Sequence, residues 1–167
     1  MDFKTLLPDF EAVKKTDWAK PQLKLDTKDY FGLAMLAGAV LMVVFVFLPW
    51  ITVTVSGSAA GASGSVEASK VLGIATWYGV FAFLCAVAAV VGVVYNHTEL
   101  ALCAAVLGVI FGLLGVIIEP AANVEASAEF GGIKATAKST VGHLGAFLYL
   151  AATVVTAAAA YLKITKK

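Results

Sequence analysis

The side chains capable of acid–base or metal chemistry are few and far apart. His97 and Glu99 share one short polar loop, whereas Glu119 and His143 border two other apolar runs. A Glu119–His143 contact would be a hydrogen bond, because a metal site there lacks enough ligands. The chain contains no nucleophile elbow, phosphate-binding loop, C-x-x-C pair or H-E-x-x-H motif. We therefore predict no enzymatic activity, no cofactor and no metal site.

The two cysteines, Cys85 and Cys103, fall in neighbouring apolar runs joined by a short polar loop. At ~1.5 Å per helical residue, their distances from that loop differ by ~10 Å. This separation exceeds the reach of a disulfide. We expect two small, buried apolar side chains.

The composition is that of an integral membrane protein. Of 167 residues, 60% are hydrophobic and 14% are charged, against about 45–50% and 25% in soluble domains. The net charge of +1 gives no reason to expect nucleic-acid binding. All 12 basic residues are lysines, so the bidentate clamps that arginine makes are missing.

Four apolar runs are long enough to cross a hydrocarbon core of about 30 Å. Tyr30 and Trp50 end the first run, as interfacial aromatic residues do. The first run is predicted to be an uncleaved span, because a leader of this length and acidity does not fit a signal peptide. The predicted spans are residues 30–50, 71–95, 100–118 and 142–162 within one membrane domain, 30–162.

Residues 1–29 form a polar segment with apolar residues near helical spacing, followed by Trp18. Two interpretations stay open, an amphipathic helix in the membrane interface and a solvated tail. This segment holds six lysines, and the tail at 163–167 holds three. The loops between the spans hold only three, which places both termini in the cytoplasm. We expect a plasma membrane, as in the inner membrane of a bacterium.

The stretch 124–139 predicts a polar β-hairpin with its turn at Gly131-Gly132. Counting outward, apolar residues oppose apolar residues and glutamates oppose lysines, so one register is strongly favoured. The outer loop 123–139 is therefore a candidate interaction surface. Its residues of interest are Glu125, Glu129, Phe130, Gly131, Gly132, Ile133, Lys134 and Lys138.

The loop 51–69 predicts a second, looser hairpin. A turn at Ala59-Ala60 would pair Val53 with Val66 and Ile51 with Ala68. Both halves of the chain repeat one plan, an outgoing span, a hairpin and a returning span. Side-by-side hairpins could merge into one antiparallel sheet, which is more stable than an isolated hairpin. The expected fold is an all-α transmembrane four-helix bundle with a small extracytoplasmic antiparallel β-sheet.

Small residues recur at intervals of four in the last three runs, which permits close helix packing in lipid. The predicted packing faces are Ala75, Gly79, Ala82 and Ala86 in the second run, Ala104, Gly108 and Gly112 in the third, and Ala152, Thr156 and Ala160 in the fourth.

The layout resembles claudin-type four-span proteins, with inner termini, a β-forming first outer loop, a short inner turn and a second outer loop. Trp50 follows the first run, as a tryptophan does in that family's first loop. The family's Gly-Leu-Trp-Cys-Cys motif is absent, and neither outer loop contains a cysteine. The resemblance implies a scaffold or lateral assembly role by analogy of architecture.

These patterns predict a non-enzymatic structural or assembly protein of the membrane. Its partners would be the lipid bilayer and either further copies of itself or other membrane proteins. The alternative is a small channel or transporter subunit for a neutral solute, since no charged side chain lies inside a predicted span.

Overall fold

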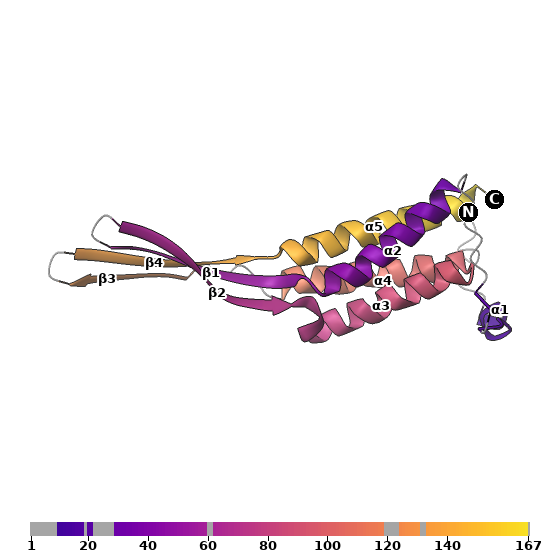
Figure 1. Cartoon of the computed structure of the whole chain (residues 1–167), viewed down its shortest axis with the longest axis horizontal. Helices are drawn as coiled ribbons and strands as arrows, with labels where there is room; N and C mark the ends of the chain where they lie inside the picture. Colours follow the sequence, from indigo (N-terminus) through magenta and orange to yellow (C-terminus); the bar gives the residue numbers. More distant parts are fainter. Residues whose placement is uncertain are drawn as a thin grey trace.

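The computed structural model describes residues 10–18, 20–21, 29–59, 62–118, 124–130 and 133–166, with the backbone alone for residues 10, 59, 62, 68, 124–130 and 133–141. Most of these residues are helical, and the rest of the regular structure is a small antiparallel sheet (Figure 1). The elements, in order, are α1 (Phe10–Lys14), α2 (Tyr30–Val46), β1 (Pro49–Ala59), β2 (Ala62–Leu72), the 3-10 turn η2 (Gly73–Ala75), α3 (Trp77–Val94), α4 (Thr98–Ile117), β3 (Val124–Phe130), β4 (Ile133–Gly142) and α5 (Leu144–Thr165).

Helices α2 to α5 form a ring in which α2 and α4 each contact both α3 and α5. Within the described residues, α3, α4 and α5 are long and apolar enough to cross a membrane, and α2 is a shorter apolar helix of 17 residues. The expected spans 30–50 and 71–95 were wrong at the ends that meet the sheet. Pro49 has no amide hydrogen and starts β1, and β2 runs on to Leu72 before α3 begins.

The interior of the ring is lined mainly by small side chains, and the bulky ones face outward. The predicted packing residues of α3, α4 and α5 are all buried, from Gly79 to Ala160. Ala75 is the exception, because it lies exposed in η2 and not in α3. On the outside of all four helices lie large apolar residues that are about half exposed, among them Val44, Leu84, Ile110 and Val154.

Local hydrogen bonds set the helix ends. Asp29 caps α2 by accepting from the Gly32 amide at 2.9 Å, an arrangement typical of an acidic N-cap. The α3–α4 turn is a Schellman motif with Asn96 at φ 59°. There the His97 amide donates to the Gly92 carbonyl at 2.7 Å. This closure explains why so few residues suffice to reverse the chain.

The sheet has the strand order β2-β1-β4-β3, with every neighbouring pair antiparallel. The predicted register of the β3–β4 hairpin is confirmed, with Phe130 opposite Ile133 and Glu125 opposite Lys138. The two hairpins join through β1 and β4, from Thr52 opposite Gly142 outward. The expectation of one sheet built from both hairpins is therefore confirmed.

The predicted register of the first hairpin was wrong. Ala59 pairs with Ala62, so Val66 lies opposite Val55 and not Val53. The register shifts again between Val53 and Thr54 and between Pro49 and Ile51. These shifts are β-bulges, which counting outward from a turn does not reveal.

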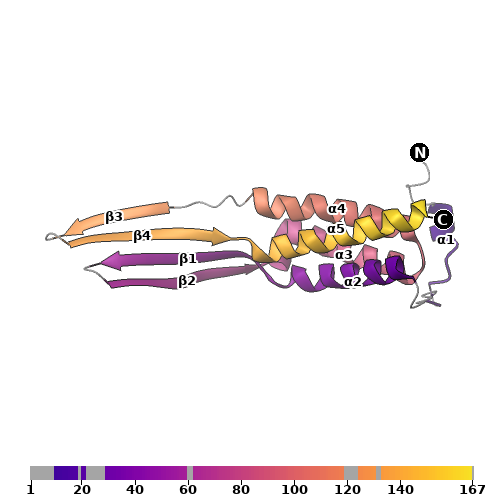
Figure 2. The same cartoon turned by 90° about the horizontal axis from the view of Figure 1, so that it is seen from above.

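The sheet projects from one end of the bundle along its long axis (Figures 1 and 2). Helix α1, the start of α2 and the end of α5 lie at the opposite end. An even number of antiparallel helices produces this separation.

Candidate functional site at the junction of sheet and bundle

Trp50 marks the junction between the sheet and the bundle. The register shift between Pro49 and Ile51 makes it the extra residue of a bulge in β1. Its side chain is 0% exposed, and its Nε1–H donates to the Phe45 carbonyl at 2.9 Å. The expected position of this indole at the lipid interface is therefore wrong, because the bulge turns it into the interior.

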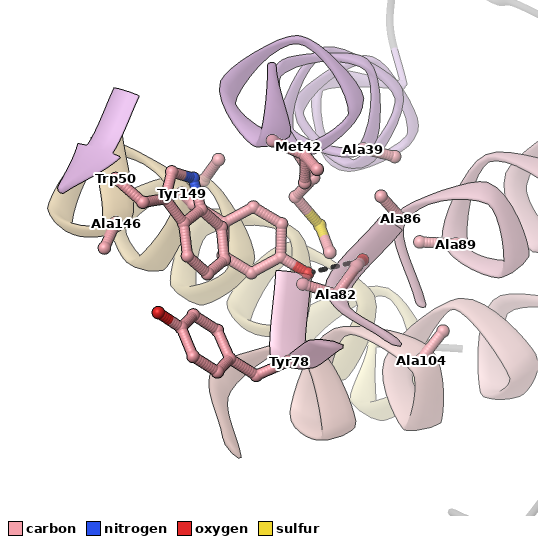
Figure 3. Packing of buried hydrophobic residues seen from close by; sticks show 12 residues of the cluster. Ala39, Met42, Trp50, Tyr78, Ala82, Ala86, Ala89, Ala104, Ala146 and Tyr149 are labelled. Carbon is pink, nitrogen blue, oxygen red and sulfur yellow. Dashed lines mark hydrogen bonds between the residues drawn. The ribbon is translucent and has the colours of Figure 1, made fainter. Parts of the chain in front are cut away.

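Two tyrosines enclose the indole, one from α3 and one from α5 (Figure 3). The ring centroid of Tyr78 lies 6.0 Å away in a stacked arrangement, and that of Tyr149 lies 5.2 Å away in a tilted one. The Tyr149 hydroxyl donates to the Ala82 carbonyl at 2.8 Å (Figure 3). This buried hydrogen bond joins α5 to α3.

Three glycines make room for Trp50. A Cβ on Gly73 would lie 2.5 Å from Trp50 Nε1, and one on Gly115 would lie 2.8 Å from Cε3 of the indole. A Cβ on Gly145 would lie 2.5 Å from the Pro49 carbonyl oxygen. We define Trp50, Tyr78, Tyr149 and these glycines as the junction cluster. It connects β1, η2, α3, α4 and α5 at one level, and the sequence alone did not indicate it.

His143 lies beside this junction, between β4 and α5. Its side chain is 9% exposed, and neither ring nitrogen has a hydrogen-bond partner among the residues whose side chains are described. Glu119, its predicted partner, lies outside the described residues, so their contact stays a prediction.

The remaining reactive side chains are dispersed. Cys85 is buried in α3, Cys103 is half-buried in α4, and both are free thiols. His97 lies at the far end of the bundle, where its Nε2 is 2.7 Å from the Thr16 hydroxyl. In the described part of the chain, no three His, Cys, Asp or Glu side chains could together hold a metal ion.

The far end of the bundle holds the segment that precedes α2. The Tyr95 hydroxyl donates to the Trp18 carbonyl at 2.6 Å, and the two rings meet edge to face. Trp18 remains 46% exposed and Tyr30 75% exposed, as aromatic residues at a lipid interface would be. Residues 1–9, part of the proposed amphipathic helix, lie outside the described residues.

An ion pair connects α2 to α5 at the same end. Lys163 Nζ lies 2.6 Å from Asp29 Oδ2, and both side chains are about one quarter exposed. The hydrogen bond from Lys163 and the one from the Gly32 amide hold the pKa of Asp29 below its ordinary value. The charged side chains of the helices thus cluster at their ends.

The outer sheet is the second candidate surface. The structure places the backbone of Glu125, Glu129, Lys134 and Lys138 at the expected register positions. Their side chains, and those of Phe130 and Ile133, lie outside the described ones, as do Gly131 and Gly132. Whether these side chains form an interaction surface therefore stays a prediction.

Comparisons with protein-family models, with curated proteins and with solved structures find no match to this chain. Function is therefore inferred from the geometry of the bundle, the junction cluster and the sheet.

Proposed function

We propose that this chain is a non-enzymatic integral membrane protein that crosses the membrane four times and acts in structural assembly. The outward-facing belt of bulky apolar side chains on all four helices carries this proposal. Water would make such a belt a strong aggregation liability, whereas lipid solvates it. Glu99 and Lys163 are the only Asp, Glu or Lys residues within α2 to α5, and each lies in a terminal turn.

The fourth span in this proposal is α2. A helix of 17 residues is about 25 Å long, at the lower limit for a transmembrane helix. Its amide hydrogen bonds continue past Val46, from Phe47 to Val44 and from Leu48 to Phe45. The chain then enters β1 at Pro49, which pairs with Leu72 of β2.

The excess of lysines in residues 1–29 and 163–167 over the loops that form the sheet supports cytoplasmic termini and an extracytoplasmic sheet. Single-cysteine variants in a Cys85→Ala, Cys103→Ala background test this topology. Ser63→Cys at the exposed end of the sheet should react with an impermeant maleimide on intact cells. Lys166→Cys should react only after permeabilisation. Labelling of both positions, or of neither, on intact cells would contradict the topology.

The assembly role rests on the sheet. It extends beyond the helices, and its described side chains beyond Thr54 are mostly exposed. A sheet built by two hairpins far apart in the sequence and left uncovered is suited to bind another protein. Chemical cross-linking in native membranes, followed by native mass spectrometry in mild detergent, tests this role. A strictly monomeric chain with no co-purifying protein would refute it.

The alternative of a channel for a neutral solute gains no support from the bundle interior. Met42, Trp50 and Tyr149 are fully buried there. A liposome flux assay that detected solute permeation would favour the channel over the assembly role.

A further inference from the structure

The register of the sheet sorts its residues into two chemically different faces. In antiparallel strands, directly paired residues lie on the same face, and successive rows alternate between faces. The row through Val55 contains Val66, Ser139 and Val124, the row through Gly57 contains Gly64, Ala137 and Ala126, and the row through Ala59 contains Ala62, Ala135 and Ala128. We define these three rows as the apolar face.

The alternate rows are polar. The row through Ser56 contains Ser65, Lys138 and Glu125, and the row through Ser58 contains Ser63, Thr136 and Ser127. Antiparallel sheets normally cover their apolar face and expose the polar one to water. Here Val55 is 38% exposed and Val66 is 71% exposed, although both belong to the apolar face. No described helix or strand of the same chain covers them.

We propose that the apolar face packs against the same face of a second copy of this chain, an inference that rests on the proposed assembly function. Three rows of four residues, with rows about 6.6 Å apart on one face and strands about 4.8 Å apart, present about 400 Å². Two copies would therefore bury about 800 Å², the size of a weak, transient interface. The three rows hold no Asp, Glu or Lys, so identical copies meet there without charge repulsion. Their glycines and alanines permit the close spacing of stacked sheets.

Pairing through the sheet edge is less favourable than pairing through the face. The edge strand β2 carries Glu67 and Lys70, which form an ion pair at 2.5 Å. Ala68 is the extra residue of a bulge between them. Charges and bulges on an edge strand are devices that prevent another strand from adding to it.

Val66→Glu tests the proposal, with Ser65→Glu as the matched control. Both residues are exposed neighbours on β2, but they lie on opposite faces. The full-length proteins are compared by sedimentation in density-matched mild detergent. Wild type and Ser65→Glu should dimerise at high protein concentration, whereas Val66→Glu should self-associate at least about tenfold more weakly because a charged side chain on each copy would be buried against apolar residues.

The outcomes separate this inference from the proposed function. Unchanged dimers of Val66→Glu would overturn the inference and leave an assembly role through another surface. A monomeric wild type that co-purifies with a different protein would also overturn the inference and leave the assembly role standing. A monomeric wild type without any partner would overturn both.

The accessibility of the apolar face to a thiol reagent in native membranes provides a second test of the pairing, without detergent. In native membranes, a cysteine at Val66 should react with a maleimide at least about tenfold more slowly than a cysteine at Ser65. The single chain exposes both positions, so equal rates would contradict the pairing.

Discussion

Replacing Trp50 by alanine should remove the side chain that joins the sheet to the bundle. The indole is fully buried and contacts two tyrosine rings. Truncating a buried tryptophan costs about 3–5 kcal/mol in transfer free energy and cavity formation. Each aromatic pair adds about 0.5–1.5 kcal/mol beyond the buried area. We therefore expect the free energy of unfolding to fall by at least about 3 kcal/mol.

Trp50→Phe separates packing from hydrogen bonding. Phenylalanine retains an aromatic ring but cannot donate to the Phe45 carbonyl. The lost hydrogen bond should cost about 0.5–1.5 kcal/mol, and the smaller ring adds part of the cavity cost. The phenylalanine variant should therefore lie between wild type and Trp50→Ala.

Equilibrium unfolding in mixed micelles, followed by circular dichroism, measures these differences. Trp77→Ala is the matched control, because Trp77 is 56% exposed at the start of α3. Its half-exposed ring meets Tyr78 and Phe81 edge to face, so its replacement should lower the unfolding free energy by only about 1 kcal/mol. If Trp50→Ala costs no more than Trp77→Ala, the junction cluster does not stabilise the fold.

Further substitutions test other contacts by the same unfolding assay. Tyr149→Phe should cost about 0.5–1.5 kcal/mol through its buried hydrogen bond, and an unchanged midpoint would contradict that bond. Gly38→Ala should cost about 1–3 kcal/mol, since its Cβ would collide with α5, while Ala37→Val on the exposed side of α2 should be neutral. Asp29→Ala should cost about 1 kcal/mol at neutral pH, from the lost cap and the partly exposed ion pair. Lys163 lowers the pKa of Asp29, so this contribution is fully present above about pH 4 and is lost as the pH falls further, through the lowered pKa of the folded state. A difference in melting temperature between wild type and Asp29→Ala that did not shrink between neutral pH and about pH 2 would contradict this assignment.

Much of the fold could be predicted from local pattern. The β3–β4 register followed from a Gly-Gly turn flanked by strict alternation, because a slip of one residue would exchange the two faces. The helices α4 and α5 likewise followed from long apolar runs ended by polar residues. The buried packing faces followed from small residues at helical spacing, with Ala75 as the error. Each of these features depends on interactions between residues close in the chain.

Trp50 and the first hairpin show what local pattern could not determine. An aromatic residue at the end of an apolar run looks the same whether it faces lipid or turns inward. The choice depends on Gly73, Gly115 and Gly145, which come from three separate elements and open the space that the indole fills. The bulge that turns Trp50 inward also shifts the β1–β2 register. The sequence by itself therefore determined the apolar runs and the tight β3–β4 hairpin. Only the tertiary structure decided how sheet and bundle join, because that junction is made by residues distant in the chain.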